Sequence, residues 1–201
     1  MSNLKTVLKT IIFTLLILSV SGQVFAADIA KGQGLARRVC AACHGKQGIS
    51  RAPVFPNLSG QKQAYLFKQL KDFKAGVRSS NNMQGVTASL SEEDMSNVAA
   101  YFAAHGNVEA SAKKVSQSLL KKVDDKLNIC MPCHTRSGIS QNDKFPNLAG
   151  QKDRYLQKEL EKFKKGKRKD ATMSAIVKQL DKKDIKNLSK YFSRAGKIKI
   201  Q

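Results

Sequence analysis

The chain has 201 residues, no tryptophan, and 36 lysine and arginine residues against 15 aspartate and glutamate residues, for a formal net charge of +21. This length suits one ordinary domain or two small ones, and small domains usually need a stabilising element beyond a core of side chains alone. The excess of positive charge argues against basic partners and favours acidic proteins, anionic membrane surfaces or nucleic acid.

The N-terminal residues predict export from the cytoplasm. Two lysines precede an apolar run at residues 11–20, and a pattern of small residues ends at Ala26. This layout is typical of a secretory signal peptide, and the run is shorter than the roughly 20 apolar residues of a membrane-spanning helix. We therefore expect residues 1–26 to be the signal peptide of a periplasmic protein, with an uncleaved anchor as the alternative. A periplasmic location excludes nucleic acid as a partner.

The rest of the chain contains one pattern written twice. The residues CAACH at 40–44 return ninety positions later as CMPCH at 130–134. The stretch FPNLSGQK at 55–62 returns as FPNLAGQK at 145–152, and the same register continues to the end of each copy. Repetition at one fixed spacing indicates two tandem copies of one structural unit.

Each copy is predicted to be mostly helical, because its apolar residues recur at helical spacing and no useful alternating strand pattern is found. The fold class is therefore all-α, with one domain at residues 27–108, a second at 109–201, and a linker at 107–114. Helices are expected from Asp28 towards Cys40, at 61–75, from Ser91 to Gly106, at 151–165 and at 181–193. The segments 48–59 and 77–90 are predicted to be loops that wrap around a bound group.

The pairs Cys40/Cys43 and Cys130/Cys133, each followed directly by a histidine, carry the strongest chemical signal. Two thiols three positions apart can form thioethers to the two vinyl groups of one porphyrin, and the adjacent histidine then becomes an axial iron ligand. Redox disulfides and zinc half-sites are the alternatives. Two such motifs in register predict two covalently bound haem c groups, with His44 and His134 as ligands.

Met83 and Met173 are the candidates for the sixth ligand, because each lies at the same place before the last helix of its copy. Met95 is expected to be a core residue, and Met131 lies inside the haem motif. A thioether ligand favours ferrous iron and raises the reduction potential. Because His/Met ligation also fills both axial positions, it predicts an electron carrier and argues against an enzyme.

With its tandem CxxCH motifs, FPNLxGQK stretches and late methionines, the mature chain resembles the dihaem cytochrome c4 family. The resemblance implies two cytochrome c folds joined by a short linker, with the haems near the interface between them. It also implies a periplasmic electron carrier, often one that delivers electrons to a terminal oxidase.

The resemblance extends to individual residues around the haems. It implies that the backbone carbonyls of Pro56 and Pro146 accept hydrogen bonds from the ligand histidines, an arrangement that orients the ring and tunes the metal. It implies, less directly, that Arg78 and Arg168 face haem propionates. Cytochrome c folds often have a small residue eight positions before the first cysteine, where two terminal helices cross. Gly32 fits this position, whereas Lys122 stands there in the second copy, so we expect a looser crossing.

Three functions compete on this basis. The first is an electron shuttle, steered by its basic surface to acidic redox proteins such as a terminal oxidase or a quinol-oxidising complex, with possible association with anionic membrane surfaces. The second is the dihaem subunit of an enzyme such as flavocytochrome c sulfide dehydrogenase. The third, a haem peroxidase or a thiosulfate-oxidising enzyme, needs an exchangeable axial ligand or a cysteinate, and the chain has no fifth cysteine.

Charge separates the two copies. Residues 27–108 contain ten lysine and arginine residues against five acidic ones, whereas residues 109–201 contain 24 against ten. The net charges are therefore +5 and +14. The second copy is predicted to carry most of the positive surface.

Overall fold

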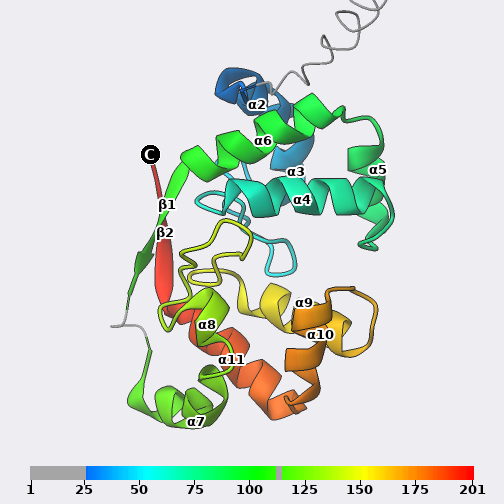
Figure 1. Ribbon diagram of the computed structural model, residues 1–201. Coiled ribbons are helices and arrows are strands. Elements are labelled where there is room, and N and C mark those ends of the chain that lie inside the picture. Colours follow the sequence, from blue (N-terminus) through cyan, green and yellow to red (C-terminus); the bar gives the residue numbers. More distant parts are fainter. Residues whose placement is uncertain (1–25, 112–114) are drawn as a thin grey trace, which may run out of the picture.

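The computed structural model describes residues 26–111 and 115–201, and it contains two helical units that face each other through their loops (Figure 1). The prediction of two tandem, mostly helical domains is confirmed. The predicted signal peptide lies outside the described residues except for Ala26. Within the described ranges, no helix has the length and apolar character needed to cross a bilayer.

The first unit contains five helices and a π-helical turn, and two of its helices begin at polar caps found in the sequence. Their bounds are α2 (Ile29–Leu35), η1 (Ala36–Cys40), α3 (Ala41–His44), α4 (Gln63–Lys74), α5 (Asn81–Ala88) and α6 (Glu92–Ala104). The Asp28 carboxylate accepts a hydrogen bond from Lys31 N at 3.0 Å. Ser91 and Asp94 form a reciprocal capping box before α6, which satisfies backbone donors that a helix start leaves free.

The second unit repeats this arrangement. Its helices are α7 (Gln117–Leu127), α8 (Met131–His134), α9 (Asp153–Lys164), α10 (Ala171–Lys178) and α11 (Lys182–Arg194). Asp181 and Asp184 form the capping box of α11. The predicted helices agree with the observed ones except for small differences at their ends.

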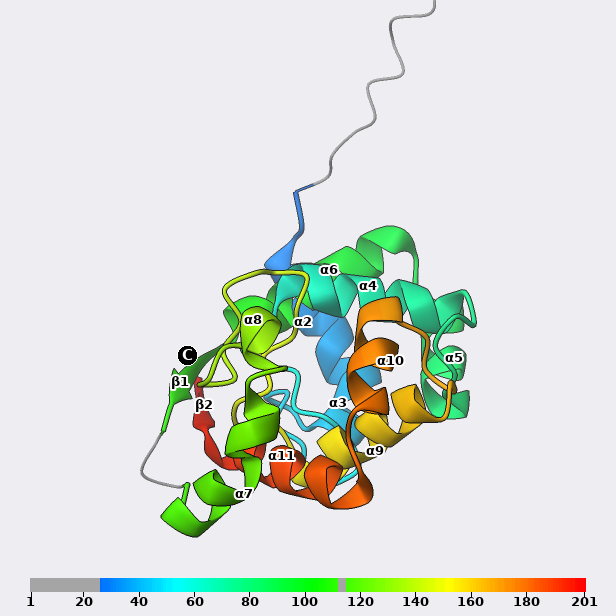
Figure 2. The ribbon, with the colours of Figure 1, turned by 60° about the horizontal axis from the view of Figure 1, so that its bottom comes forward.

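The prediction that residues 77–90 are loop was wrong, because this segment contains the two-turn helix α5. Ser80 caps it by accepting a hydrogen bond from Met83 N, and Asp170 does the same for Met173 N at the start of α10. The segment has few apolar residues and an internal glycine, so its helical period is weak. In Figures 1 and 2, α5 and α10 lie on the same side of the molecule, opposite the two strands.

The sequence also missed two short strands. Strand β1 (Gly106–Ala110) falls largely in the predicted linker, and it pairs antiparallel with β2 (Gly196–Ile200) at the C-terminus. Figure 1 shows this pair along one edge of the molecule. Because each strand has five residues and its partner lies far away in the sequence, the pairing leaves no local signature. The strands tie the end of the second unit to the end of the first.

The helix crossing at Gly32 is as tight as the sequence suggests. A Cβ atom built on Gly32 would lie 2.6 Å from the Asn97 carbonyl carbon of α6. In the second unit, however, the expectation that Lys122 occupies the crossing was wrong, because Lys122 is exposed and Val123 is buried there. The π-helical turn η1 has no counterpart in α7 and accommodates one extra residue before Cys40, which shifts the register of this helix.

We predict that Gly32→Ala lowers the free energy of unfolding of the haem-loaded protein by about 1–3 kcal/mol, because the added methyl group overlaps the α6 backbone. Gly34→Ala is the matched control, since its nearest neighbour is Arg38 Nη1 at 3.7 Å and alanine is the better helix former. Urea unfolding of both variants provides the measurement. Equal stability of the two variants would contradict the tight crossing.

Candidate functional site

A cavity of about 810 Å³ runs between the two units and is lined by residues of both. Its lining includes all eight residues predicted to bind the two haems: Cys40, Cys43, His44, Met83, Cys130, Cys133, His134 and Met173. The short turns α3 and α8 present the cysteines and histidines, and helices α5 and α10 present the methionines. The structure therefore brings the predicted site residues to one place, from segments about forty residues apart in each unit.

Both histidines are held by backbone carbonyls. His44 Nδ1 lies 2.9 Å from the Pro56 oxygen, and His134 Nδ1 lies 3.0 Å from the Pro146 oxygen. Since a carbonyl only accepts, each Nδ1 must carry the proton, which leaves the Nε2 lone pair free to bind a metal. Burial lowers the pKa of both imidazoles, although the carbonyls work in the opposite direction. Both rings are therefore neutral, the form that coordinates iron.

The other two methionines of the described residues lie elsewhere. Met95 is buried in the core of the first unit, and Met131 packs against the core of the second. Met83 and Met173 are half-buried in the first turn of their helices and line the cavity. The cavity thus offers one thioether sulfur and one imidazole in each unit.

The four cysteines are free thiols in the structure. Burial raises the pKa of Cys40 and of Cys130 to about 11, with a smaller contribution from Cys133 in the second case. Burial therefore favours the protonated thiol over the thiolate at Cys40 and Cys130. No three His, Cys, Asp or Glu side chains of the described ranges come together as a zinc site requires. The donors fit a covalently attached haem in each unit.

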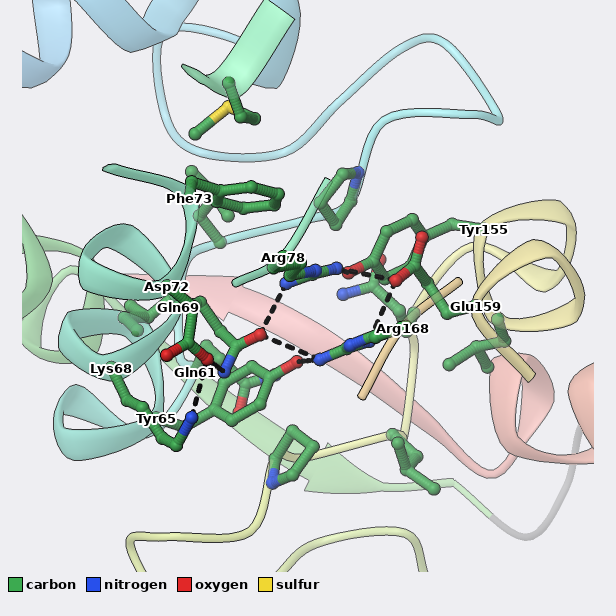
Figure 3. Close-up of a pocket in the computed structure, with 18 of the residues that line it drawn as sticks. Gln61, Tyr65, Lys68, Gln69, Asp72, Phe73, Arg78, Tyr155, Glu159 and Arg168 are labelled. Atoms are coloured by element: carbon green, nitrogen blue, oxygen red, sulfur yellow. Dashed lines mark hydrogen bonds and ion pairs between the residues drawn. The ribbon is translucent and has the colours of Figure 1, made fainter. Parts of the chain in front are cut away.

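Arg78 and Arg168 meet at the centre of the interface, where Figure 3 shows their guanidinium groups side by side between Gln69 and Glu159. Glu159 Oε2 accepts hydrogen bonds from Arg78 Nη2 at 2.7 Å and from Arg168 Nη1 at 2.9 Å. Gln69 Oε1 accepts from the same two arginines at 2.7 and 2.8 Å. We call these four residues the arginine cluster.

Aromatic side chains complete the surroundings of the arginine cluster. Arg78 Nη2 donates to the Tyr155 hydroxyl at 2.9 Å, and Arg168 Nη2 donates to the Tyr65 hydroxyl at 3.0 Å. Each guanidinium also lies over a phenylalanine ring of its own unit, at 4.5 Å for Phe73 and 4.4 Å for Phe163. Arg78 and Arg168 therefore each contact both units.

The arginine cluster has two buried cations and one buried carboxylate. Lys162 Nζ adds a further positive charge at 2.9 Å from Glu159 Oε1. Arg78 Nε is buried without a hydrogen-bond partner among the described residues. Buried charges are costly unless they are paired, so this part of the cavity suits additional anionic groups. Haem propionates are groups of that kind.

Sequence reasoning missed several residues of this interface. Four of them were used in the sequence only to identify the repeat, yet they form buried hydrogen bonds between the units: Asn57, Gln61, Asn147 and Gln151. Their recurrence with unchanged spacing was the available signal. The replacement of Gln69 by Glu159 in the second copy gave no such signal. A single difference between two polar residues on a helix does not indicate which residues of the other unit it contacts.

We predict that Glu159→Gln weakens the interface, with a loss of about 3–5 kcal/mol in unfolding free energy at neutral pH if no other anion compensates. Burial opposes ionisation of Glu159, but Arg78 and Arg168 outweigh it and lower the pKa of this carboxyl. The ionised carboxylate therefore stabilises the fold fully above its unfolded pKa of about 4.3, and this contribution is lost as pH falls through the lower folded value. The test measures the free energy of unfolding of the unmodified protein and of the Glu159→Gln variant at several pH values. A difference in stability between the two proteins that persists well below pH 4 would contradict the predicted role of the ionised carboxylate.

Comparison with known proteins agrees with this geometry. The family model of cytochrome C oxidase, cbb3-type, subunit III matches residues 27–102, and that of cytochrome c matches residues 126–195. Cytochrome c4 of Pseudomonas aeruginosa is 37% identical over 195 residues, which cover 91% of this chain and 96% of that protein. A thiosulfate dehydrogenase electron acceptor of Stutzerimonas stutzeri is 36% identical over 200 residues, covering 90% of this chain and 91% of that protein.

A solved structure extends the similarity to the whole fold. The crystal structure of reduced recombinant cytochrome c4 from Pseudomonas stutzeri superimposes with a TM-score of 0.75 at 35% identity, covering 85% of this chain and all of that one. The resemblance found in the sequence is therefore confirmed. The chain belongs to the cytochrome c4 family of dihaem electron-transfer proteins and carries two covalently bound haem c groups.

Proposed function

We propose that this protein carries single electrons between periplasmic redox proteins and delivers them to a terminal oxidase. The main support for this proposal is the lining of one cavity, in which each unit contributes two cysteines, one histidine and one methionine. In this proposal a signal peptide at residues 1–26 is removed, and domains at 27–108 and 109–201 hold one haem each. A bound haem supplies an iron that alternates between the ferric and ferrous states.

The proposed ligands suit electron transfer. His44 with Met83, and His134 with Met173, would each hold one haem iron from two sides, which would leave no place for a small substrate at the iron. The carbonyls of Pro56 and Pro146 fix the tautomer and orientation of the two imidazoles, and Met83 and Met173 lie on helices, so these four residues would hold the group in a constant geometry. Arg78 and Arg168 would neutralise buried propionates at the interface between the haems. The residues therefore hold and shield the groups, and they do not catalyse a reaction of their own.

We predict that Met83→Ala opens one axial position in one haem, so that the reduced protein binds carbon monoxide at half of its haems at neutral pH. Met173→Ala should do the same for the other haem, and the double variant should bind at both. Optical titration with carbon monoxide measures the fraction. Met95→Leu is the control, because Met95 is a core residue outside the cavity. Tight carbon monoxide binding by the unmodified protein would contradict the proposed ligands.

The two units differ around the rim of the cavity. In the first unit, Val54 is 44% exposed and Val77 is 52% exposed. The repeat places Lys144 and Lys167 at the same two positions of the second unit, and both lysines are exposed. Ser79 and its exposed counterpart Lys169 form a third matched pair, and we call the positions of these three pairs the rim positions.

The rim positions favour an acidic partner at the second unit. Three lysines near a haem cavity raise the local concentration of an acidic protein and orient it, whereas the valines and the serine of the first unit do not. The larger net charge of residues 109–201 acts in the same direction. We therefore propose that electrons leave from the second unit to an acidic site on the oxidase, and that a quinol-oxidising complex or another donor reduces the first.

We predict that replacing Lys144, Lys167 and Lys169 by Val, Val and Ser lowers the rate of electron transfer to an acidic copper domain of a terminal oxidase about tenfold at low salt. The loss should shrink as ionic strength rises, because salt screens exposed charges. The matched control places lysines at Val54, Val77 and Ser79, which keeps the second unit intact. Stopped-flow reduction of the copper domain provides the rates. A rate that depends on neither salt nor these lysines would count against docking at the second unit.

A second candidate function is suggested by the thiosulfate dehydrogenase electron acceptor of Stutzerimonas stutzeri described above. In this role the protein accepts electrons from a periplasmic dehydrogenase, either as a free acceptor or as a bound dihaem subunit like that of a flavocytochrome c sulfide dehydrogenase. Purification from the native host separates the cases. A stoichiometric, salt-resistant complex with a dehydrogenase supports the subunit role, and a free monomer reduced by added dehydrogenase and thiosulfate supports the acceptor role.

A further inference from the structure

One peptide group in the first unit joins its ligand histidine to the second unit. The Pro56 carbonyl oxygen accepts a hydrogen bond from His44 Nδ1 at 2.9 Å. The N–H of the same peptide group, which belongs to Asn57, donates to Gln151 Oε1 at 2.8 Å. A continuous chain of hydrogen bonds therefore runs from a side chain of the second unit to the histidine of the first.

The reciprocal chain is present as well. His134 Nδ1 lies 3.0 Å from the Pro146 oxygen, and the N–H of Asn147 donates to Gln61 Oε1 at 2.7 Å. The two chains are built from repeat-equivalent residues and cross the interface in opposite directions. The arrangement therefore occurs twice, in independent segments.

The orientation of each glutamine is fixed by a second bond. Gln151 Nε2 donates to the Asn57 carbonyl oxygen at 2.9 Å, and Gln61 Nε2 donates to the Asn147 carbonyl oxygen at 2.9 Å. Because the amide nitrogen can only donate and a backbone N–H needs an acceptor, the reverse orientation would leave both bonds unmade. Both glutamines are buried, at 6% and 7% exposure, so water does not compete for these groups.

Hydrogen bonds in such a chain reinforce one another. An acceptor on a peptide N–H polarises the amide and increases the negative charge on its carbonyl oxygen. The oxygen then pulls more strongly on the histidine N–H, which makes the imidazole a stronger electron donor to the metal. A stronger donor favours ferric iron, so the glutamine acts to lower the reduction potential of the haem in the other unit.

We propose that Gln151 and Gln61 are positioning residues that act across the domain interface, Gln151 on His44 and Gln61 on His134, so that each unit adjusts the reduction potential of the haem held by the other. This inference rests on the proposed role of both histidines as axial ligands. Neither glutamine touches a metal or a substrate, and each works through one peptide group.

The test replaces each glutamine in the haem-loaded protein and measures both midpoint potentials. Gln151→Leu removes the acceptor for Asn57 N–H at similar side-chain volume, so the midpoint of the His44 haem should rise while that of the His134 haem changes less. Gln61→Leu should give the reverse pattern. Redox titration followed by NMR resolves the haems, since the resonances of each haem are assigned through contacts with Phe55 or Phe145 of its own unit.

Two controls separate this role from a general loosening of the interface. Asp143→Asn weakens the cross-interface pair of Lys62 Nζ and Asp143 Oδ1 at 3.6 Å without touching either peptide group, so it should not produce the crossed pattern. Gln151→Glu keeps an oxygen acceptor at Asn57, so the midpoint of the His44 haem should stay at or below its original value. This variant also supplies the test if the leucine variants fail to fold, because a rise in that midpoint would overturn the proposal.

The outcomes distinguish the inference from the proposed ligands. A low-spin visible spectrum of the unmodified protein in both oxidation states supports His/Met ligation, and its absence contradicts the ligands themselves. If the variants retain that spectrum, a substitution of each glutamine that mainly shifts the midpoint of the haem in the other unit supports the proposed action of the glutamines across the interface. Equal shifts of both midpoints, or a larger shift in the midpoint of the haem in the mutated glutamine's own unit, would contradict the action of the glutamines across the interface. Neither result would contradict the proposed axial ligands.

Discussion

The cavity between the two units is the constraint on which the rest of the structure depends. Each unit of some 85 residues encloses too little apolar surface for a large core of its own, and the two units share the lining of a cavity of about 810 Å³. Two haems held as proposed would fill this cavity and complete both cores. The proposed covalent attachment at the turns α3 and α8 would fix them there, and the helices, caps and strands hold the surrounding walls in place.

The interface and the haem sites are parts of one structure. The segment that holds His44 through Pro56 continues directly into Asn57, which contacts the second unit, and the same holds for His134, Pro146 and Asn147. The arginine cluster lies at the same interface with more buried positive than negative charge. A movement of the units against each other would therefore disturb His44, His134 and the arginine cluster at the same time.

Much of this structure could be predicted from the sequence, because the relevant signals are local or repeated. The spacing of Cys40, Cys43 and His44 and its recurrence gave the cofactor and the two domains, and Ser91 and Asp181 gave helix starts. What escaped prediction depends on distant partners or small shifts of register. Strand β1 pairs with a segment about ninety residues away. The π-helical turn η1 of the first unit has no counterpart in α7, so Val123 takes the place that the repeat assigns to Lys122. Likewise, the Gln61 and Gln151 contacts follow from the docking of two whole units.

The central claim is that a haem is covalently bound in each half of the chain and fills the shared cavity. The direct measurement is the haem content of the purified protein, obtained from its pyridine haemochrome spectrum and checked by the intact mass of the denatured chain. Two haems per chain, both retained after denaturation, are the predicted result. A single haem, or haem that is released on denaturation, would contradict it.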